Sequence, residues 1–365
     1  MIDYHKKKVK RSKGRKSRKK MPIWAKVLLA VLILVVVLAG SAYGYVQYSL
    51  SKIKKVDPQK VAKVEPEEET FEADENLPSE EEVQHMDPED VVWVGADLDV
   101  MKDKDVVNIL LIGQDRREGQ GRQRSDSMIM ATLNKKNKTI SLTSFMRDLY
   151  VQIPGYSDNR INAAYAFGGM ELLDSTIETN FGVHIDGNVE VDFSGFQILI
   201  DKMGGIDMEL SQAEADYICG RTTNALYQQA ARPEWNLTAG MNHLNGEQAL
   251  VHARNRSIGN SDYERTERQR AVLTAAFDKM KNSDAGTIVT LINEAFPLLT
   301  TDLDSNQILG YAMEIVKMGI GSVQSYRVPV DGGYTPAVIR QMQVLVPDLE
   351  KNQNYLKETL YGKSE

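Results

Sequence analysis

The stretch V-V-N-I-L-L-I, residues 106–112, decides the fold, and Gly113-Gln114-Asp115 follows it directly. An apolar run with a single polar member is typical of a central strand that is covered on both faces. Because Gly113 ends the run, we expect Asp115 at the carboxyl end of this strand. Open α/β sheets bind their ligands at that edge. The stretch therefore predicts the centre of the fold and the position of a site.

Helical and extended patterns alternate on either side of this strand. The further strands that we predict are 128–133, 139–143, 150–153, 185–191, 206–210 and 324–328. The predicted helices are 169–181, 193–203, 244–253, 262–281, 286–297 and 305–318. Helices interleaved with strands predict an α/β fold with a mixed central β-sheet and helices on both of its faces.

The first 48 residues predict a membrane anchor. Residues 1–20 hold eleven Lys/Arg and one acid, and residues 27–46 contain no charged side chain. A helix of twenty apolar residues spans about 30 Å, the thickness of a bilayer core. The positive-inside rule then predicts a single-pass protein of the cell membrane, with a cytoplasmic tail (1–22), one transmembrane helix (23–48) and an extracellular remainder.

Two alternatives to this interpretation remain open. Residues 39–42, A-G-S-A, could serve as a signal-peptidase site, and a cleaved signal peptide is the first alternative. A nucleic-acid-binding arm is the second alternative for the basic tail. We expect no nucleic-acid partner, because anionic lipid already explains the basic charge. The residues after 20 are also acidic, with 33 Lys/Arg against 50 Asp/Glu.

Residues 49–92 predict an extracellular stalk and acidic linker. Thirteen acids and three prolines lie between Val64 and Asp90, and this composition predicts an extended, solvated spacer. The catalytic domain is expected at 93–350, followed by a C-terminal tail at 351–365. The single cysteine, Cys219, excludes an intramolecular disulfide, which favours a Gram-positive cell envelope.

Charged side chains recur near the ends of predicted strands and on one face of a predicted helix. Carboxylates hold divalent cations and guanidiniums bind phosphate oxygens, so together these side chains predict a site for a pyrophosphate and its metal ion. Each one alone is equally explained as a turn cap, a surface ion pair, a solvated helix end or a helix–helix contact. The candidates are Asp115, Arg124, Asp126, Arg147, Arg254, Arg256, Arg265, Arg268 and Gln269.

In order and spacing, these residues and their neighbours resemble the LytR–CpsA–Psr family of cell-wall enzymes. The motifs are N-I-L-L-I-G-Q-D from Asn108, R-S-D-S-M from Arg124, S-F-M-R-D-L-Y-V-Q-I-P from Ser144, R-I-N-A-A-Y-A-F-G-G from Arg160, V-D-F-S-G-F from Val191, M-G-G-I-D from Met203, L-N-G-E-Q-A-L-V-H-A-R-N-R from Leu244 and R-x-x-R-Q from Arg265. They cover residues 105–275. Met146 and Leu149 depart from the family pattern, which more commonly has Pro and Thr there.

The resemblance implies a phosphotransferase of the class EC 2.7.8.-. Such an enzyme moves an anionic glycopolymer, a teichoic acid or a capsular polysaccharide, from a polyprenyl-pyrophosphate carrier to a sugar hydroxyl of peptidoglycan, and leaves a phosphodiester link. The implied partners are the lipid-linked glycan, peptidoglycan and the lipid membrane. The implied cofactor is Mg²⁺, with Mn²⁺ as an alternative.

The resemblance also implies a role for each candidate residue. Asp115 and Asp126 resemble the pair that holds the metal ion, and Asp115 is our candidate for receiving the proton of the acceptor hydroxyl. The implied catalytic residues are Asp115, Arg124, Arg147, Arg254 and Arg256. The implied pyrophosphate-binding residues are Arg124, Arg147, Arg254, Arg256, Arg265 and Gln269, with Arg268 in the same motif.

Other classes of function are kept beside this one. A membrane-anchored regulator would use the basic tail, and a non-catalytic scaffold would bind the lipid-linked glycan without chemistry. A polyprenyl-pyrophosphatase activity, with water as acceptor, would be a side reaction of the same site. The sequence contains no H-E-x-x-H, G-x-S-x-G or G-x-x-x-x-G-K-[ST] motif, so it gives no support to a zincin, a serine hydrolase or a P-loop enzyme.

Overall fold

The computed structural model describes residues 43–57, 60–93, 99–115, 121–222, 232, 234–259, 262–319 and 322–362. The chain divides into two units, Met1–Tyr48 and Ser49–Glu365. The predicted cytoplasmic tail and most of the predicted transmembrane helix lie outside the described residues. Within the described ranges, no helix combines the length and the apolar character that a membrane span requires.

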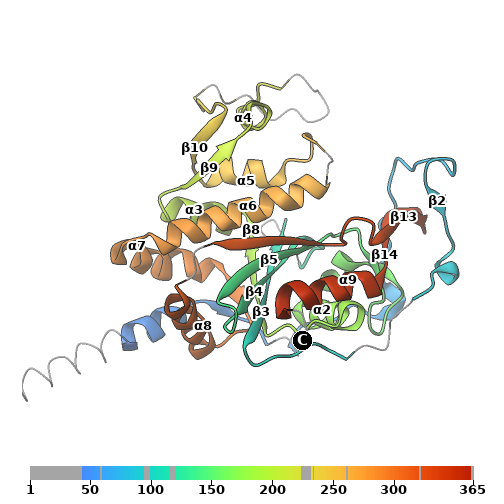
Figure 1. The fold of residues 1–365 in the computed structure, drawn as a ribbon, viewed down its shortest axis with the longest axis horizontal. Helices are drawn as coiled ribbons and strands as arrows, with labels where there is room; N and C mark the ends of the chain where they lie inside the picture. Colours follow the sequence, from blue (N-terminus) through green and yellow to red (C-terminus); the bar gives the residue numbers. More distant parts are fainter. Residues whose placement is uncertain are drawn as a thin grey trace, which may run out of the picture. The chain divides into compact units, whose positions relative to one another are not determined.

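A seven-stranded mixed sheet forms the centre of the second unit (Figure 1). Its strands, in spatial order, are β1 (Lys54–Lys55), β11 (Thr300–Thr301), β8 (Gly187–Asp192), β3 (Val106–Gln114), β4 (Ser125–Asn134), β5 (Thr139–Phe145) and β12 (Val323–Val328). β3 runs parallel to β8 and antiparallel to β4. The prediction that the apolar run at residues 106–112 is a central strand is therefore confirmed.

Helices cover both faces of this sheet, as predicted. They are α2 (Ile161–Phe181) and α9 (Leu349–Leu356) on one face, and α3 (Phe193–Lys202), α5 (Gly246–Arg254) and α6 (Asp262–Lys281) on the other (Figure 1). Side chains alternate along β3, so Leu110 and Ile112 enter the core with α2, while Leu111 and Gly113 face α3, α5 and α6.

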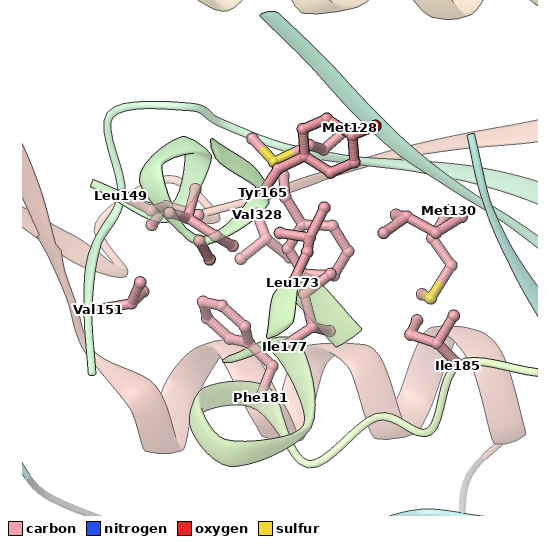
Figure 2. Close-up of a cluster of buried hydrophobic side chains, with 14 of the residues drawn as sticks. Met128, Met130, Leu149, Val151, Tyr165, Leu173, Ile177, Phe181, Ile185 and Val328 are labelled. Atoms are coloured by element: carbon pink, nitrogen blue, oxygen red, sulfur yellow. The ribbon is translucent and has the colours of Figure 1, made fainter. Parts of the chain in front are cut away.

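The core between the sheet and α2 is closely packed. Figure 2 shows Leu173, Ile177 and Phe181 of α2 in the same cluster as Met128 and Met130 of β4. All five side chains are almost fully buried. Truncating a buried side chain of this size costs roughly 2–5 kcal/mol. The packing on this face therefore contributes strongly to the stability of the sheet.

Two predicted helix boundaries differ from the structure for reasons that lie in the backbone. α2 begins before the predicted start at 169, and its backbone leaves the helical region at Gly169, where φ is 69°. The prediction detected only the segment after this kink. Residues 240–244 form a strand, and α5 begins after Asn245, whose side chain accepts a hydrogen bond from the backbone N–H of Gln248.

The remaining elements surround this framework. They are β2 (Gln84–His85), β6 (Tyr150–Val151), β7 (Asn159–Arg160), β9 (Ile206–Leu210), α4 (Gln212–Ile218), β10 (Gly240–Leu244), α7 (Ala285–Thr290), α8 (Ser305–Met318), β13 (Tyr334–Ile339) and β14 (Met342–Pro347), with the short helices η2 (Pro66–Glu68), η3 (Pro88–Asp90), η5 (Leu291–Ala295), η6 (Phe296–Leu298) and η7 (Lys357–Tyr361). The predicted strand at 150–153 is the short β6, which pairs with β7 outside the main sheet.

The end of the chain is part of the domain, so the prediction of a C-terminal tail at 351–365 is wrong for its described part. α9 and η7 pack against α2 and the sheet, and Leu356 and Leu360 are at most 2 % exposed. The hairpin of β13 and β14 precedes them. The prediction failed because a short segment rich in Asn, Gln and Lys has the composition of a solvated chain. Its few apolar side chains do not reveal from sequence that they pack in the core.

The predicted solvated spacer also packs along the domain; we call residues 60–93 the N-terminal segment. The Val64 N–H donates to the carbonyl of Phe167 at 2.8 Å, and β2 pairs in parallel with β13. The ring of Trp93 stacks on Tyr150 with centroids 6.0 Å apart. Backbone hydrogen bonds and aromatic contacts of this kind offset the entropy that is lost when the segment is ordered, and composition alone does not reveal them.

Candidate active site

Two carboxylates come from neighbouring strands at one edge of the sheet. Asp115 follows β3 directly, and Asp126 lies on β4. Gly113 pairs with Ser127, and the register then shifts between Gly113 and Gln114. Such a bulge re-aims the side chains that follow it. Antiparallel pairing thus brings the end of β3 and the start of β4, with their two aspartates, to the same edge.

A buried polar network, which the sequence patterns do not predict, holds this bulge. Gln114 is fully buried, and its amide donates a hydrogen bond to the carboxylate of Glu190 on β8. The Tyr165 hydroxyl donates to the other oxygen of Glu190. The side-chain Oε1 of Gln114 accepts a hydrogen bond from the backbone N–H of Gln123 at 3.2 Å. The network therefore joins the end of β3 to Gln123, which directly precedes Arg124.

Four arginines from three parts of the chain surround one cavity of about 570 Å³, which we call the arginine cavity. They are Arg147 after β5, Arg254 and Arg256 at the end of α5, and Arg265 on α6. Asp126 and Gln269 lie in the same wall. The structure thus brings together six of the nine candidate residues, although they are up to 143 positions apart in the sequence.

The end of α5 explains how two of these arginines reach the same space. Asn255 follows the last helical residue with φ −64° and ψ 121°, which is extended backbone. Residues on either side of an extended residue lie on the same side of the chain. Arg254 and Arg256 therefore both line the cavity, as their spacing predicted.

Ion pairs hold the guanidiniums in place. Arg147 Nη1 lies 3.4 Å from Asp126 Oδ1, and Arg147 Nε lies 3.5 Å from Asp148 Oδ2. Burial alone would lower the pKa of Arg147, but nearby carboxylates, led by Asp148, raise it above its usual value. Burial lowers the pKa of Arg256, and neighbouring Arg147 adds to this effect. Both groups stay cationic, so the cavity keeps its positive charge at neutral pH.

The arginine cavity offers more hydrogen-bond donors than the protein uses. The described part of its wall holds four guanidiniums against two carboxylates, Asp126 and Glu247. Within the described chain, the buried Nε atoms of Arg147 and Arg265 donate no hydrogen bond. Buried donors normally have partners. The more exposed guanidiniums of Arg254 and Arg256 suit an anion with many oxygens, such as a diphosphate.

An apolar cavity of about 100 Å³ adjoins the arginine cavity between the sheet and helices α3, α5 and α6. Phe193, Leu250, Arg254 and Gln269 line both cavities. The guanidinium of Arg254 lies 4.3 Å from the centroid of the Phe193 ring, at the junction. The other apolar wall residues are Leu111, Ile112, Ile129, Val191, Phe196, Ala253, Val272 and Leu273. Sequence reasoning could not assign these residues, because they are ordinary core residues in pattern.

The family model that matches the chain is that of the LytR_cpsA_psr family, over residues 61–358. The chain belongs to this family. It is 29% identical to TagT of Bacillus subtilis, a polyisoprenyl-teichoic acid–peptidoglycan teichoic acid transferase, over 276 residues that cover 74% of this chain and 75% of the relative. It is 30% identical to the regulatory protein MsrR of Staphylococcus aureus over 239 residues, 64% of this chain and 68% of the relative.

A solved structure of TagT bound to LI-WTA has the same fold. The TM-score is 0.55 at 27% identity, and the match covers 70% of this chain and 89% of that structure. The LytR_cpsA_psr match begins at residue 61, so it includes the N-terminal segment that composition alone had assigned to a spacer. The prediction of the family and of its mixed α/β fold is therefore confirmed.

Three candidates of this LytR_cpsA_psr chain lie outside the wall of the arginine cavity. Asp115 is tied to it through Arg254, with 3.5 Å between Oδ2 and Nη2. Arg124 is held by the N-terminal segment instead: its Nη2 donates to the Thr70 carbonyl at 2.7 Å, and its Nε lies 3.2 Å from Glu72 Oε1. Arg124 thus anchors that segment in this structure.

Arg268 faces away from the cavity, although it shares a motif with Arg265. Its Nε donates to Glu214 of α4 at 3.0 Å, and its Nη1 donates to the carbonyl of Asn255 at 3.2 Å. Its Nη2 donates to the carbonyl of Ile258 at 3.0 Å. Arg268 therefore supports the loop that carries Arg256, and the structure does not bring it to the pyrophosphate site that we predicted for it.

The chemistry of the two aspartates is compatible with a hard cation whose other ligands would come from a substrate and water. Asp115 and Asp126 each make one long ion pair, at 3.5 and 3.4 Å, which leaves carboxylate oxygens for a cation. Over the described residues, no group of three or more His, Cys, Asp or Glu side chains could hold a metal ion. Mg²⁺ commonly uses one or two carboxylates and takes its other ligands from phosphates and water.

Proposed function

We propose that the protein is a phosphotransferase that moves an anionic glycopolymer from a polyprenyl-pyrophosphate carrier to a sugar hydroxyl of peptidoglycan. The observation that carries this proposal is the junction of the arginine cavity and the apolar cavity, which suits a diphosphate with a hydrocarbon tail. The name of the relative TagT describes the same reaction class with teichoic acid as cargo. A teichoic acid or a capsular polysaccharide is the cargo that we propose here.

The chemistry is a displacement at phosphorus. The acceptor oxygen forms a bond to the phosphorus that carries the glycan, and the bond from this phosphorus to the bridging oxygen breaks. Polyprenyl phosphate leaves with the electron pair of that bond. Negative charge on the phosphate oxygens must be stabilised throughout, and positioning with electrostatics supplies most of the catalysis in such reactions.

The side chains of the arginine cavity have distinct tasks in this scheme. Arg147 and Arg256 bind the phosphate that carries the glycan, since both belong to the arginine cavity and Arg147 lies beside Asp126. Arg254 stands at the junction on Phe193, where the leaving phosphate and the lipid tail meet. Arg265 and Gln269 orient the diphosphate from α6. Fixed donors of this kind need no reorganisation during the reaction.

We propose that Asp115 and Asp126 hold Mg²⁺, with Mn²⁺ as an alternative. When bound, the cation neutralises charge on the diphosphate. The pairing of Asp115 with Arg254 and of Asp126 with Arg147 then places each carboxylate beside an arginine that binds the same ligand. This pairing supports the assignment, because the diphosphate at the arginines and the Mg²⁺ at the aspartates would then be neighbours.

We further propose that residues 23–48 anchor the protein in the cell membrane and that the enzyme domain is extracellular. The basic residues 1–20 on the cytoplasmic side support this orientation. The proposed acceptor, peptidoglycan, lies on the same outer side. Protease added to intact protoplasts should remove the domain and leave the basic tail protected. Protection of the domain would contradict the orientation.

The decisive experiment combines the full-length protein in detergent with a lipid-pyrophosphate-linked glycan, peptidoglycan oligomers and Mg²⁺. We expect glycan to become joined to peptidoglycan, and Asp126→Asn to abolish this transfer. Asp216→Asn is the matched control, because Asp216 is also paired with an arginine, Arg221, but lines neither the arginine cavity nor the apolar cavity. If the unmutated protein binds the donor but transfers no glycan, the result supports the alternative function, a non-catalytic scaffold that binds the lipid-linked glycan.

A further inference from the structure

A second polar cavity, of about 340 Å³, lies beside the arginine cavity and shares Arg147 and no other described residue with it. Its walls come from the β13–β14 hairpin, from Asp262 and Tyr263 at the start of α6, and from Asp74 and Val83 of the N-terminal segment. Asp262 also pairs with Arg256 and Arg265 of the arginine cavity, at 3.4 and 2.8 Å. The two cavities thus meet at Arg147 and Asp262.

The wall of this second cavity is held by a buried arginine. The Arg160 side chain is 7 % exposed and is paired with Asp74 and, at 3.4 Å, with Asp148. Its Nη2 also donates to the carbonyl of Gln343 at 2.8 Å, and the N–H of Gln343 donates to Asp74 at 2.7 Å. The cavity is therefore pre-formed, and the charge of Arg160 is already neutralised.

The charges of the two cavities differ in sign. The described wall of the second cavity holds three carboxylates, Asp74, Asp148 and Asp262, against two guanidiniums, whereas that of the arginine cavity holds four guanidiniums against two carboxylates. The excess of carboxylates in the second cavity disfavours a diphosphate or an anionic polymer, whereas the excess of guanidiniums in the arginine cavity favours one. An uncharged molecule with many hydroxyl groups suits the second cavity.

Aromatic and amide groups complete such a site. The Tyr263 ring lines the cavity, and its centroid lies 6.0 Å from that of Tyr334 on β13. Gln343 also lines the cavity and is held to the N-terminal segment, because its side-chain amide donates to the carbonyl of Asn76 at 2.9 Å. Apolar surface with a few fixed polar groups is the usual composition of a small-molecule site.

We propose that this second cavity, the acceptor cavity, binds a sugar unit of the peptidoglycan glycan strand and presents its hydroxyl to the arginine cavity past Arg147. The proposal rests on the proposed function. The hydroxyl oxygen forms the new bond to phosphorus, the bond to the bridging oxygen breaks, and polyprenyl phosphate leaves. The hydroxyl proton passes to the carboxylate of Asp262, which lines the acceptor cavity.

The pKa of Asp262 agrees with this role. Burial raises the pKa of the Asp262 carboxyl, although Arg147 and Arg256 act against burial. A carboxyl with a raised pKa is a better proton acceptor near neutral pH. Asp115, which we predicted for this role, is a weaker candidate in this scheme, because a carboxylate that binds a cation has little basicity left.

The test fills the acceptor cavity from two independent sides in the full-length protein. Val83→Trp and Gln343→Trp place an indole in the cavity from the N-terminal segment and from β14. Thr335→Trp is the matched control, since Thr335 is an exposed residue of the same hairpin outside the cavity wall. The readouts are the KM for peptidoglycan oligomers, the KM for the lipid-linked donor, and direct calorimetric binding of the oligomers.

We expect both filled variants to raise the acceptor KM about tenfold or more, equivalent to about 1.4 kcal/mol, while the donor KM and the control stay unchanged. An unchanged acceptor KM in both variants, or a raised donor KM instead, would overturn the proposal. If the unmutated protein transfers no glycan, the proposed function fails. The calorimetric comparison then still decides whether the cavity binds the oligomers, because only the filled variants should lose that binding.

Discussion

Arg147 Nη1 lies 3.4 Å from Asp126 Oδ1, and this pair joins the end of β5 to the start of β4 at the edge of the sheet. The same guanidinium lines both the arginine cavity and the acceptor cavity. One side chain thus contacts the proposed metal ligand and lines both the cavity proposed for the donor phosphate and the cavity proposed for the acceptor. No other described side chain lines both polar cavities.

Arg147→Lys tests this central position. Lysine keeps the charge but loses the planar fork that binds two oxygens at once. We expect kcat/KM for transfer to fall about 100-fold or more, since removing one fixed donor at a reacting phosphate or oxyanion costs this much. Circular dichroism and the melting temperature should stay close to those of the unmutated protein. Arg221→Lys, at a surface ion pair, is the control, and an unchanged rate for Arg147→Lys would remove Arg147 from the mechanism.

Leu273→Trp tests the apolar cavity. Leu273 lies in the wall of this cavity and is only partly buried, so an indole can occupy the space without breaking a core. We expect the KM for a long-chain polyprenyl donor to rise at least tenfold, whereas a donor with a short, soluble chain should be affected much less. The measurement is donor KM against chain length. Equal effects on both donors would show that the hydrocarbon tail lies elsewhere.

Arg268→Met tests a structural role. Arg268 is buried and is the partner of Glu214 and of two backbone carbonyls. Removing one partner of a buried pair leaves the other charge uncompensated, so we expect the free energy of unfolding to fall by about 3 kcal/mol. Urea denaturation measures the change. The double variant Arg268→Met/Glu214→Gln should recover part of the loss, and a variant that loses activity at full stability would contradict this role.

His252 gives the domain a predicted sensitivity to acid. Burial lowers its pKa to about 4, with Glu214 acting in the opposite direction, whereas an unfolded chain has a histidine pKa of about 6.5. Between these values the unfolded state binds the proton and the folded state does not, so stability falls as the pH drops from about 6.5 to about 4. The full loss is about 3 kcal/mol.

The check is urea denaturation of the unmutated protein and of His252→Gln at pH 7, 5.5 and 4.5. Glutamine cannot be protonated in this range, so the stability difference between the two proteins should shift in favour of the variant as the pH falls. The intrinsic cost of the substitution is the same at each pH and cancels. A difference that is independent of pH would show that His252 does not titrate as inferred.

Much of the fold could be predicted because its signals are local. The apolar run of β3 identifies a strand whatever surrounds it, and the extended spacing of Arg254 and Arg256 was enough to predict that both face one site. The β13–β14 hairpin could not be predicted in this way. Its turn uses Arg340 and Gln341 at φ 49° and 62°, a left-handed conformation that normally signals Gly or Asn.

The candidate site was predictable in residue type more than in arrangement. Arg265 and Arg268 belong to one motif, yet the first lines the cavity and the second binds Glu214 of another helix. Whether an arginine already donates its hydrogen bonds to the protein depends on residues that are distant in the sequence, as Glu214 is from Arg268. The same limit explains Arg124, whose partners Thr70 and Glu72 belong to a segment that composition had assigned to solvent.

The hydrophobic core is completed from its far end. Leu356 and Leu360 close the cluster that Leu110 and Ile112 begin, and about 250 residues of chain separate the two pairs. Until residue 360 has been synthesised, the side chains of α2 lack their contacts with Leu356 and Leu360. Because we propose that the chain crosses a membrane, we infer that this cluster is completed only after residue 360 has reached the outer side.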